Sequence, residues 1–195
     1  GQRMQKARAL AHDLQRTCEK IAAIPPRVAR LGELAYNLWW GWNPSGRRAF
    51  EILDPELWEQ VRRNPVQFLR ELASDKLLAA SQDQNYLKVY DRAIANFGEY
   101  FSEKATWFDA TYPYFTDRCI AYFSFEFGLH ASLPIYSGGL GVLSGDHTKE
   151  ASDLGLPLTA VGFVYNQGYF SQKITEDGWQ EKRNLVVNFD EIPII

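Results

Sequence analysis

The stretch Ser-Gly-Gly-Leu-Gly-Val-Leu-Ser-Gly-Asp at residues 137–146 constrains the fold of this chain most. An apolar run at residues 120–127 precedes it and is typical of a buried strand, whereas residues 140–154 show helical spacing. Glycines at the start of a helix let the backbone approach a ligand closely, and the first helical N–H groups favour an anion. The layout predicts a site for phosphate or a sugar phosphate. The alternative is a tight turn that leads into a packed helix.

Composition excludes several classes of protein. The chain has 195 residues, 46% of them hydrophobic, which fits one domain or one domain with a helical extension. The net charge is −3 and there is no basic run, so we expect no nucleic acid partner. Cys18 and Cys119 are far apart and form no CxxC pair, which argues against a metal site and favours a cytoplasmic protein. No segment is apolar over the roughly 20 residues that a membrane helix needs.

The first part of the chain reads as a series of short helices. Residues 5–23 have helical spacing, and residues 84–104 carry the clearest apolar stripe. Asp54 and Asn64 each precede a proline, which is a typical start of a helix, and Ser45 is the predicted cap of another. We therefore expect a helical region over residues 1–117.

Three tryptophans, Trp39, Trp40 and Trp42, lie within four positions and cannot all share one helix face. They are either a hydrophobic anchor between helices, which is the commoner role of such clusters, or a surface on which sugars stack. The sequence leaves both interpretations open.

The pattern changes at residue 118. Residues 119–127 are almost continuously apolar, as expected of a strand that is buried on both faces of a parallel sheet. Residues 157–164 read as the next strand, after a helix with Gly155 at its C-terminal cap. Such a β-α-β unit should have parallel strands and a right-handed crossover. A hairpin-like extension at 165–174 and a further strand at 185–189 would follow. We predict an α/β fold, with helices before residue 118 and an α/β sheet beginning within residues 118–195.

Several motifs then occur in the order of one family. They lie at residues 120–127, 137–143, 151–157 and 162–174, together with Leu-Trp-Trp-Gly-Trp-Asn-Pro at 38–44 and Asp-Pro-Glu-Leu-Trp at 54–58. In this order they resemble the α-glucan (glycogen, starch and maltodextrin) phosphorylases, and specifically the N-terminal part of the shorter bacterial and archaeal type. The resemblance covers most of the chain.

The resemblance implies a GT-B glycosyltransferase fold, in which two Rossmann-like domains enclose the site. It implies phosphorolysis, in which inorganic phosphate attacks the terminal α-1,4-linked glucose of a glucan and releases glucose 1-phosphate with retained configuration. The implied cofactor is pyridoxal phosphate, whose own phosphate assists as an acid or base. Its attachment lysine belongs to the second domain, so we expect the lysine outside this chain, which alone should be inactive. The chain is expected to be part of a longer protein. The sequence leaves open whether that protein forms a homo-oligomer.

The resemblance also assigns site residues. The backbone of Gly138 and Gly139 and the N–H of Leu140 would hold phosphate or the glucosyl oxygen, and Ser137 would line the glucose pocket. Glu126 stands in an otherwise apolar predicted strand, where a lone carboxylate is costly unless it is paired. It matches a family carboxylate near the same pocket, and the alternative is a salt bridge to a cation outside the chain.

Two other functions compete with this one. A nucleotide-sugar glucan synthase of the GT-B fold also has a Gly-Gly loop at a helix start, but Lys usually precedes that loop, whereas Ser137 precedes it here. A non-catalytic glucan-binding module would use the tryptophan cluster as its exposed surface. A glycoside hydrolase needs two carboxylates, and Glu126 has no obvious second.

Overall fold

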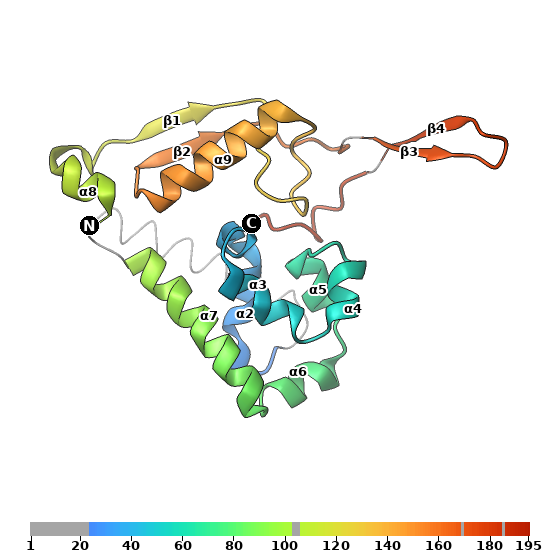
Figure 1. Ribbon diagram of the computed structural model, residues 1–195, viewed down its shortest axis with the longest axis horizontal. Helices are drawn as coiled ribbons and strands as arrows, with labels where there is room; N and C mark the ends of the chain where they lie inside the picture. Colours follow the sequence, from blue (N-terminus) through green and yellow to red (C-terminus); the bar gives the residue numbers. More distant parts are fainter. Residues whose placement is uncertain (1–23, 103–105, 169, 185) are drawn as a thin grey trace. The chain divides into compact units, whose positions relative to one another are not determined.

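The computed structural model describes residues 24–102, 106–168, 170–184 and 186–195, so the helix predicted at residues 5–23 lies outside the described residues. The chain divides into two compact units. The first contains residues up to Ser102 together with Phe189–Ile195, and the second contains the residues between them. Figure 1 shows helices in the first unit, and both strands and helices in the second.

Helices build the first unit, and all of them except α7 are short. Their bounds are Arg30–Tyr36 (α2), Pro44–Glu51 (α3), Pro55–Gln60 (α4), Pro65–Glu71 (α5), Ser74–Ala80 (α6) and Gln84–Ser102 (α7), with 3₁₀ turns at Pro26–Val28 (η1) and Leu38–Gly41 (η2). The predicted starts after Asp54 and Asn64 are confirmed, because each side chain accepts a hydrogen bond from a backbone N–H of the helix that it precedes. The predicted cap Ser45 is wrong. Asn43 caps α3 instead, and its Oδ1 accepts the N–H of Ser45 at 3.1 Å.

Aromatic rings fill the core of this unit. Trp39 and Trp40 are only 1% and 0% exposed. The rings of Phe50 and Trp58 stack with centroids 5.6 Å apart, and Phe68 meets the Trp58 ring edge-on at 5.4 Å. Trp39 and Trp40 therefore anchor the core, and the sugar-stacking interpretation is wrong for these two residues.

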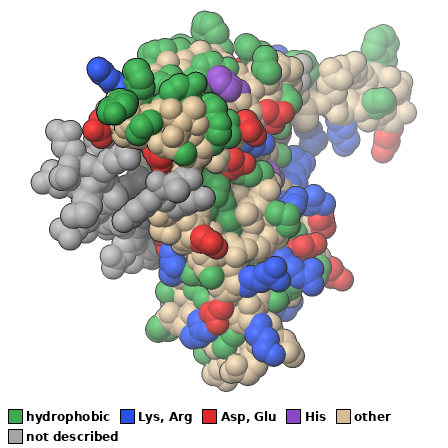
Figure 2. Space-filling view, turned by 60° about the vertical axis from the view of Figure 1, so that its left-hand side comes forward, with side chains coloured by type: hydrophobic (Ala, Val, Ile, Leu, Met, Phe, Trp, Pro, Cys, Tyr) green, Lys and Arg blue, Asp and Glu red, His purple; other side chains and the backbone are tan. Residues whose placement is uncertain are grey.

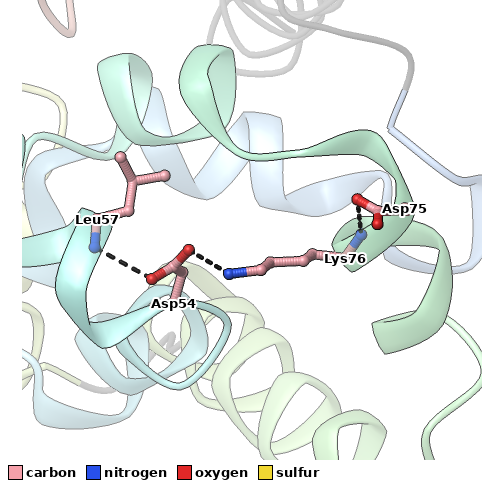
Figure 3. A network of polar contacts seen from close by, with 4 residues as sticks. All are labelled: Asp54, Leu57, Asp75 and Lys76. Carbon is pink, nitrogen blue, oxygen red and sulfur yellow. Dashed lines mark hydrogen bonds and ion pairs between the residues drawn. The ribbon is translucent and has the colours of Figure 1, made fainter.

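Polar contacts join elements of the first unit that are distant in sequence. Figure 3 shows the Asp54 carboxylate between the backbone of α4 and a side chain of α6. Its Oδ1 accepts the Leu57 N–H at 3.1 Å, and its Oδ2 lies 2.6 Å from Lys76 Nζ. The hydrogen bond from Lys76 and the helix N–H together lower the pKa of Asp54. Elsewhere in the unit, Asn64 Nδ2 donates to the carbonyl of Glu191 at 2.7 Å and so ties the last residues of the chain to α5.

The second unit contains two small sheets. Its elements are Trp107–Thr111 (α8), Pro113–Phe115 (η3), Ile120–Phe123 (β1), Gly139–Asp153 (α9), Leu158–Val161 (β2), Ser171–Ile174 (β3) and Gln180–Arg183 (β4). The predicted parallel pairing is confirmed, with Ile120 opposite Leu158. Gly155 has a φ of +76° just beyond α9, which confirms it as the cap glycine. In Figure 1, α9 runs along the β1–β2 sheet.

Two expectations for this unit are corrected. The strand predicted over residues 119–127 is only β1, and it is exposed rather than buried on both faces, because the sheet has two strands and one helix against it. Residues 106–116 contain α8, whose first turn is capped by Thr106. The hairpin pairs β3 with β4, and the described residues of 185–189 form only a single bridge, from Val186 to Gln167.

Hydrophobic side chains remain at the surface, as the green atoms in Figure 2 show. Phe123 on β1 and Leu143 on α9 are 72% and 68% exposed. Within the parts of the chain that the structure describes, no helix is both long and apolar enough to cross a membrane.

Candidate functional site

The start of α9 is open to solvent. Gly138 precedes the helix in an extended conformation, and residues 137–140 are all exposed. Among the described residues, a Cβ atom added at Gly138 or Gly139 would meet no atom within 4 Å beyond its chain neighbours. The described part of the chain therefore leaves space for a ligand in front of this backbone, which disfavours the interpretation of the glycine pair as a packed turn.

Glu126 lies beyond the end of β1 rather than within a strand. The hydroxyl of Ser124 explains where the strand ends, because it donates to the Glu126 carbonyl at 3.0 Å and accepts the Glu126 N–H at 3.4 Å. Such local side-chain bonds compete with strand pairing. Glu126 therefore lies in the loop that connects β1 with α9.

The Glu126 carboxylate reaches the start of α9. Its Oε1 accepts the Ser137 hydroxyl at 2.7 Å, and its Oε2 accepts the N–H groups of Ser137 at 3.2 Å and Gly138 at 3.4 Å. The Ser137 hydroxyl, then the backbone N–H groups, lower the pKa of Glu126. These bonds satisfy the carboxylate within the chain, so it requires no cation from elsewhere. A negative charge is also favoured at this end of a helix.

Two N–H groups remain for another acceptor. Among the described residues, no hydrogen bond to the N–H of Gly139 or Leu140 is found. Both groups point out of the first turn of a helix, where a phosphate oxygen is a favoured partner. The neighbouring charge of Glu126 opposes an anion, so a phosphate here also needs a cation.

Glycines on one face of α9 let the loop that carries Glu126 lie against the helix. The Gly128 N–H donates to the Gly141 carbonyl at 2.7 Å. A Cβ at Gly141 would collide with Tyr136 and lie 3.0 Å from Glu126 Oε2, and a Cβ at Gly145 would collide with the carbonyl of Gly128. Sequence reasoning missed this contact, although the spacing of four residues between Gly141 and Gly145 places both on one helix face.

A buried network of hydroxyl groups fixes the same loop from its other side. Ser144 on α9 is completely buried, and its Oγ lies 3.2 Å from the Tyr122 hydroxyl and 2.9 Å from Ser124 Oγ. Because Ser124 also bonds the backbone of Glu126, the network links β1, α9 and the carboxylate. No motif in the sequence signals this network.

A pocket of about 340 Å³ opens beside Glu126 and Ser137. It is lined by Glu126, Pro134, Tyr136, Ser137, Tyr165, Gln167, Gly168, Phe170, Lys182 and Asn184. Gly138, Gly139 and Leu140 do not line it. The Tyr165 hydroxyl donates to the Phe125 carbonyl at 2.8 Å, and Lys182 Nζ lies 4.9 Å from the centre of the Phe170 ring. Of the predicted site residues, the structure therefore gathers Glu126 and Ser137 in a pocket and leaves the other three exposed beside it.

A second cavity and an exposed cysteine also lie in this unit, but neither brings several polar groups together. A second cavity of about 440 Å³ is mostly apolar and is lined by Phe123, Ser124, Phe125, Val161, Gly162 and Phe163. Within the described part of the chain, no three His, Cys, Asp or Glu side chains gather closely enough to hold a metal ion. Cys119 is exposed, with its Sγ 3.6 Å from Thr159 Oγ1.

A family described as "Protein of unknown function (DUF3417)" matches residues 24–133, which is more than half of the chain. The chain belongs to the DUF3417 family. The match extends from the aromatic core of the first unit into the loop that carries Glu126. No solved structure matches this DUF3417 chain.

Named relatives of the DUF3417 chain are phosphorylases. It is 42% identical over 171 residues to maltodextrin phosphorylase of Thermococcus litoralis, covering 88% of this chain and 20% of the relative. It is 44% identical over 153 residues to glycogen phosphorylase of Aquifex aeolicus, covering 77% and 21%, and 42% identical over 166 residues to that of Mycobacterium tuberculosis, covering 83% and 19%. The resemblance to phosphorylases is thus confirmed, and the chain spans about a fifth of the length of these relatives.

Proposed function

We propose that this chain is the N-terminal part of an α-1,4-glucan phosphorylase with the GT-B fold. The longer protein would use inorganic phosphate to release glucose 1-phosphate from the ends of glycogen or maltodextrin. The observation that carries the proposal is the identity of 42–44% with proteins named phosphorylase, over 77–88% of this chain. The open start of α9 supports it, because it offers backbone N–H groups where the reaction needs an anion site. In this proposal residues 1–117 form a helical leader and residues 118–195 begin the catalytic domain.

The described geometry suggests a role for each site residue. The backbone of Gly138 and Gly139 and the N–H of Leu140 would hold phosphate or the glucosyl oxygen. Ser137 and Glu126 would orient the glucosyl hydroxyl groups from the pocket beside them. Glu126 would accept hydrogen bonds rather than donate a proton, because its lowered pKa keeps it ionised at neutral pH.

The implied cofactor is pyridoxal phosphate, which would lie close to the substrate phosphate held at the start of α9. The exposed N–H groups of Gly139 and Leu140 suit a phosphate, and a Cβ at Gly139 would occupy the open space in front of them. We place the attachment lysine outside this chain. When bound, the cofactor would supply acid–base assistance through its own phosphate.

Neither competing function gains support. Trp39 and Trp40 are buried, so they cannot form the surface of a glucan-binding module. Ser137 stands where a nucleotide-sugar synthase would carry Lys, and the relatives are named phosphorylases.

The test is an assay of the full-length protein that contains this chain. We expect release of glucose 1-phosphate from maltodextrin and inorganic phosphate, without consumption of ADP-glucose. Gly139→Ala should lower this activity while the fold stays intact, because the added methyl group meets no atom of the described residues within 4 Å but narrows the approach to the helix. The matched control is Gly98→Ala on α7, where the added methyl group also meets open space. Consumption of ADP-glucose without phosphorolysis would refute the proposal.

A further inference from the structure

Three hydroxyl groups lie behind the candidate site without contacting the Glu126 carboxylate. They belong to Tyr122, Ser124 and Ser144, and they form one chain of hydrogen bonds between β1, α9 and the loop that follows β1. We infer that Ser124 and Ser144 are positioning residues, whose hydroxyl groups set the place of the Glu126 carboxylate relative to the start of α9. The inference rests on the proposed function for its effect on the substrate, and it adds two residues to which that function assigns no role.

Ser144 joins the hydroxyl chain to the first turn of α9. Its side chain is completely buried, and its Oγ donates to the carbonyl of Leu140 at 2.9 Å. Leu140 is also one of the two residues whose N–H group is proposed to hold the anion. The same Oγ lies 2.9 Å from Ser124 Oγ, so one buried hydroxyl contacts both this turn and the loop. Because a buried hydroxyl that loses its partners costs free energy, the contact resists movement of the loop.

Ser124 joins the hydroxyl chain to Glu126. Its Oγ donates to the Glu126 carbonyl at 3.0 Å and accepts the Glu126 N–H at 3.4 Å. Both polar groups of this backbone are therefore held, which fixes the direction in which the side chain leaves it. The carboxylate then reaches Ser137, whose hydroxyl donates to Oε1 at 2.7 Å. Ser124 thus acts on the carboxylate through the backbone of the same residue.

The number of hydroxyl protons ranks the two serines. Tyr122 donates to Ser144. The two serine protons then serve three contacts, which are those with the Leu140 carbonyl, with the Glu126 carbonyl and between the serines themselves. Each hydroxyl has one proton, so one of the three contacts lacks a proton in any arrangement. Loss of the Ser144 hydroxyl leaves the Ser124 proton to the Glu126 carbonyl, whereas loss of the Ser124 hydroxyl removes both bonds to Glu126. Ser124 should therefore hold the carboxylate more strongly.

The first experiment measures the pKa of Glu126 by ¹³C NMR in the 195-residue chain. The Ser137 hydroxyl and backbone N–H groups lower this pKa, so a carboxylate that moves away from them has a higher one. Ser124→Ala should raise the pKa of Glu126, although Ser124 does not contact the carboxylate. Ser144→Ala should raise it less, and it serves if Ser124→Ala fails to fold. The other titratable side chains in the lining of the pocket, which every variant retains, are Tyr136, Tyr165 and Lys182.

Two variants are the controls. Ser124→Thr keeps the hydroxyl group, and Ser124 lines a cavity of about 440 Å³ that has room for the extra methyl group, so this variant should keep the parent pKa. Thr148→Ala removes a hydroxyl of α9 that donates to the Ser144 carbonyl at 2.7 Å, within the helix, so it should keep the parent pKa as well. An unchanged pKa of Glu126 in the folded alanine variants of Ser124 and Ser144 overturns the inference. An equal rise in Ser124→Thr overturns it too.

The second experiment measures phosphorolysis by the full-length protein. A misplaced Glu126 weakens the hydrogen bonds to the glucosyl hydroxyl groups, so Ser124→Ala should raise the KM for maltodextrin about threefold to tenfold and leave kcat close to the parent value. Ser124→Thr and Thr148→Ala should keep both parent values. Loss of folded enzyme alone would lower kcat and leave KM unchanged, and that result contradicts the inference.

The two experiments separate this inference from the proposed function, because the pKa measurement needs no catalysis. If Ser124→Ala raises the pKa of Glu126 but the full-length protein releases no glucose 1-phosphate, the phosphorylase proposal fails and the positioning role stands. If the full-length protein is a phosphorylase but the pKa of Glu126 does not respond, only the positioning role fails.

Discussion

Replacement of Gly145 by alanine tests whether close packing on α9 holds the loop that carries Glu126. A Cβ at this position would collide with the carbonyl oxygen of Gly128 and lie 2.5 Å from its carbonyl carbon. These are backbone atoms, so no side chain can rotate away to make room. The loop must move, and the 2.7 Å bond from the Gly128 N–H to the Gly141 carbonyl would be strained or lost.

The expected loss of stability follows from one stabilising effect and two destabilising ones. Alanine in a helix interior is favoured over glycine by about 1 kcal/mol. Overpacking costs about 1–3 kcal/mol, and a lost backbone hydrogen bond costs about 1 kcal/mol more. Gly145→Ala should therefore lower the free energy of unfolding of the second unit by roughly 1–3 kcal/mol. Gly98→Ala is the matched control: its added methyl group meets no atom of the described residues within 4 Å, so it should stabilise α7 by about 0.5–1 kcal/mol.

Native-state hydrogen exchange is the suitable assay, because amides in α9 and α7 report separately on the two units. Gly145→Ala should speed exchange in α9 and leave α7 unchanged, and Gly98→Ala should slow exchange in α7 alone. Slower exchange in α9 of Gly145→Ala, with the loop still in place, would refute the packing argument.

Three further predictions concern polar contacts. Ser137→Ala should raise the pKa of Glu126 in an NMR titration, since the Ser137 hydroxyl is the main cause of its lowered value; an unchanged pKa would contradict this. Lys76→Met should raise the pKa of Asp54. The pKa of Asp54 is lowered in the folded state, so the ionised carboxylate stabilises the fold above the unfolded-state pKa, and this stabilisation is lost as pH falls. The free energy of unfolding should therefore fall less between neutral and acid pH in Lys76→Met than in the parent chain. Asn64→Ala should lower the free energy of unfolding, measured with urea, by about 1–2 kcal/mol. Asn64→Asp keeps the oxygen that caps α5 but loses the Nδ2 donor, so it should lower this free energy by less. Equal losses in the two variants would argue against the cap.

Local signals in the sequence predicted helix starts well. Asp54 and Asn64 accept hydrogen bonds from N–H groups only two or three residues ahead, so sequence alone contains both partners. The same rule failed at Ser45 because Asn43, two residues earlier, precedes a proline that fits the first helical position.

The end of β1 and the partner of Glu126 could not be predicted in this way. The apolar run continues to Phe127, but β1 ends at Phe123, opposite the last residue of β2, and Ser124 then bonds the backbone of Glu126. Glu126 meets Ser137 across eleven positions, and that contact depends on the close approach of the loop at Gly141 and Gly145. The pocket also needs Gln167, which precedes β3, and Lys182 on β4, and no pattern in the sequence connects either residue with Glu126.

The bond from Asn64 to Glu191 has a consequence for the order in which the protein is made. The helical unit includes Phe189–Ile195, and Ile192 is buried, so its last piece emerges from the ribosome after the whole second unit. Its helices can associate early, but the Asn64 amide stays in water until residues 189–195 have left the ribosome. A chain cut before Phe189 should therefore expose α5 to proteases that a chain containing residues 189–195 resists.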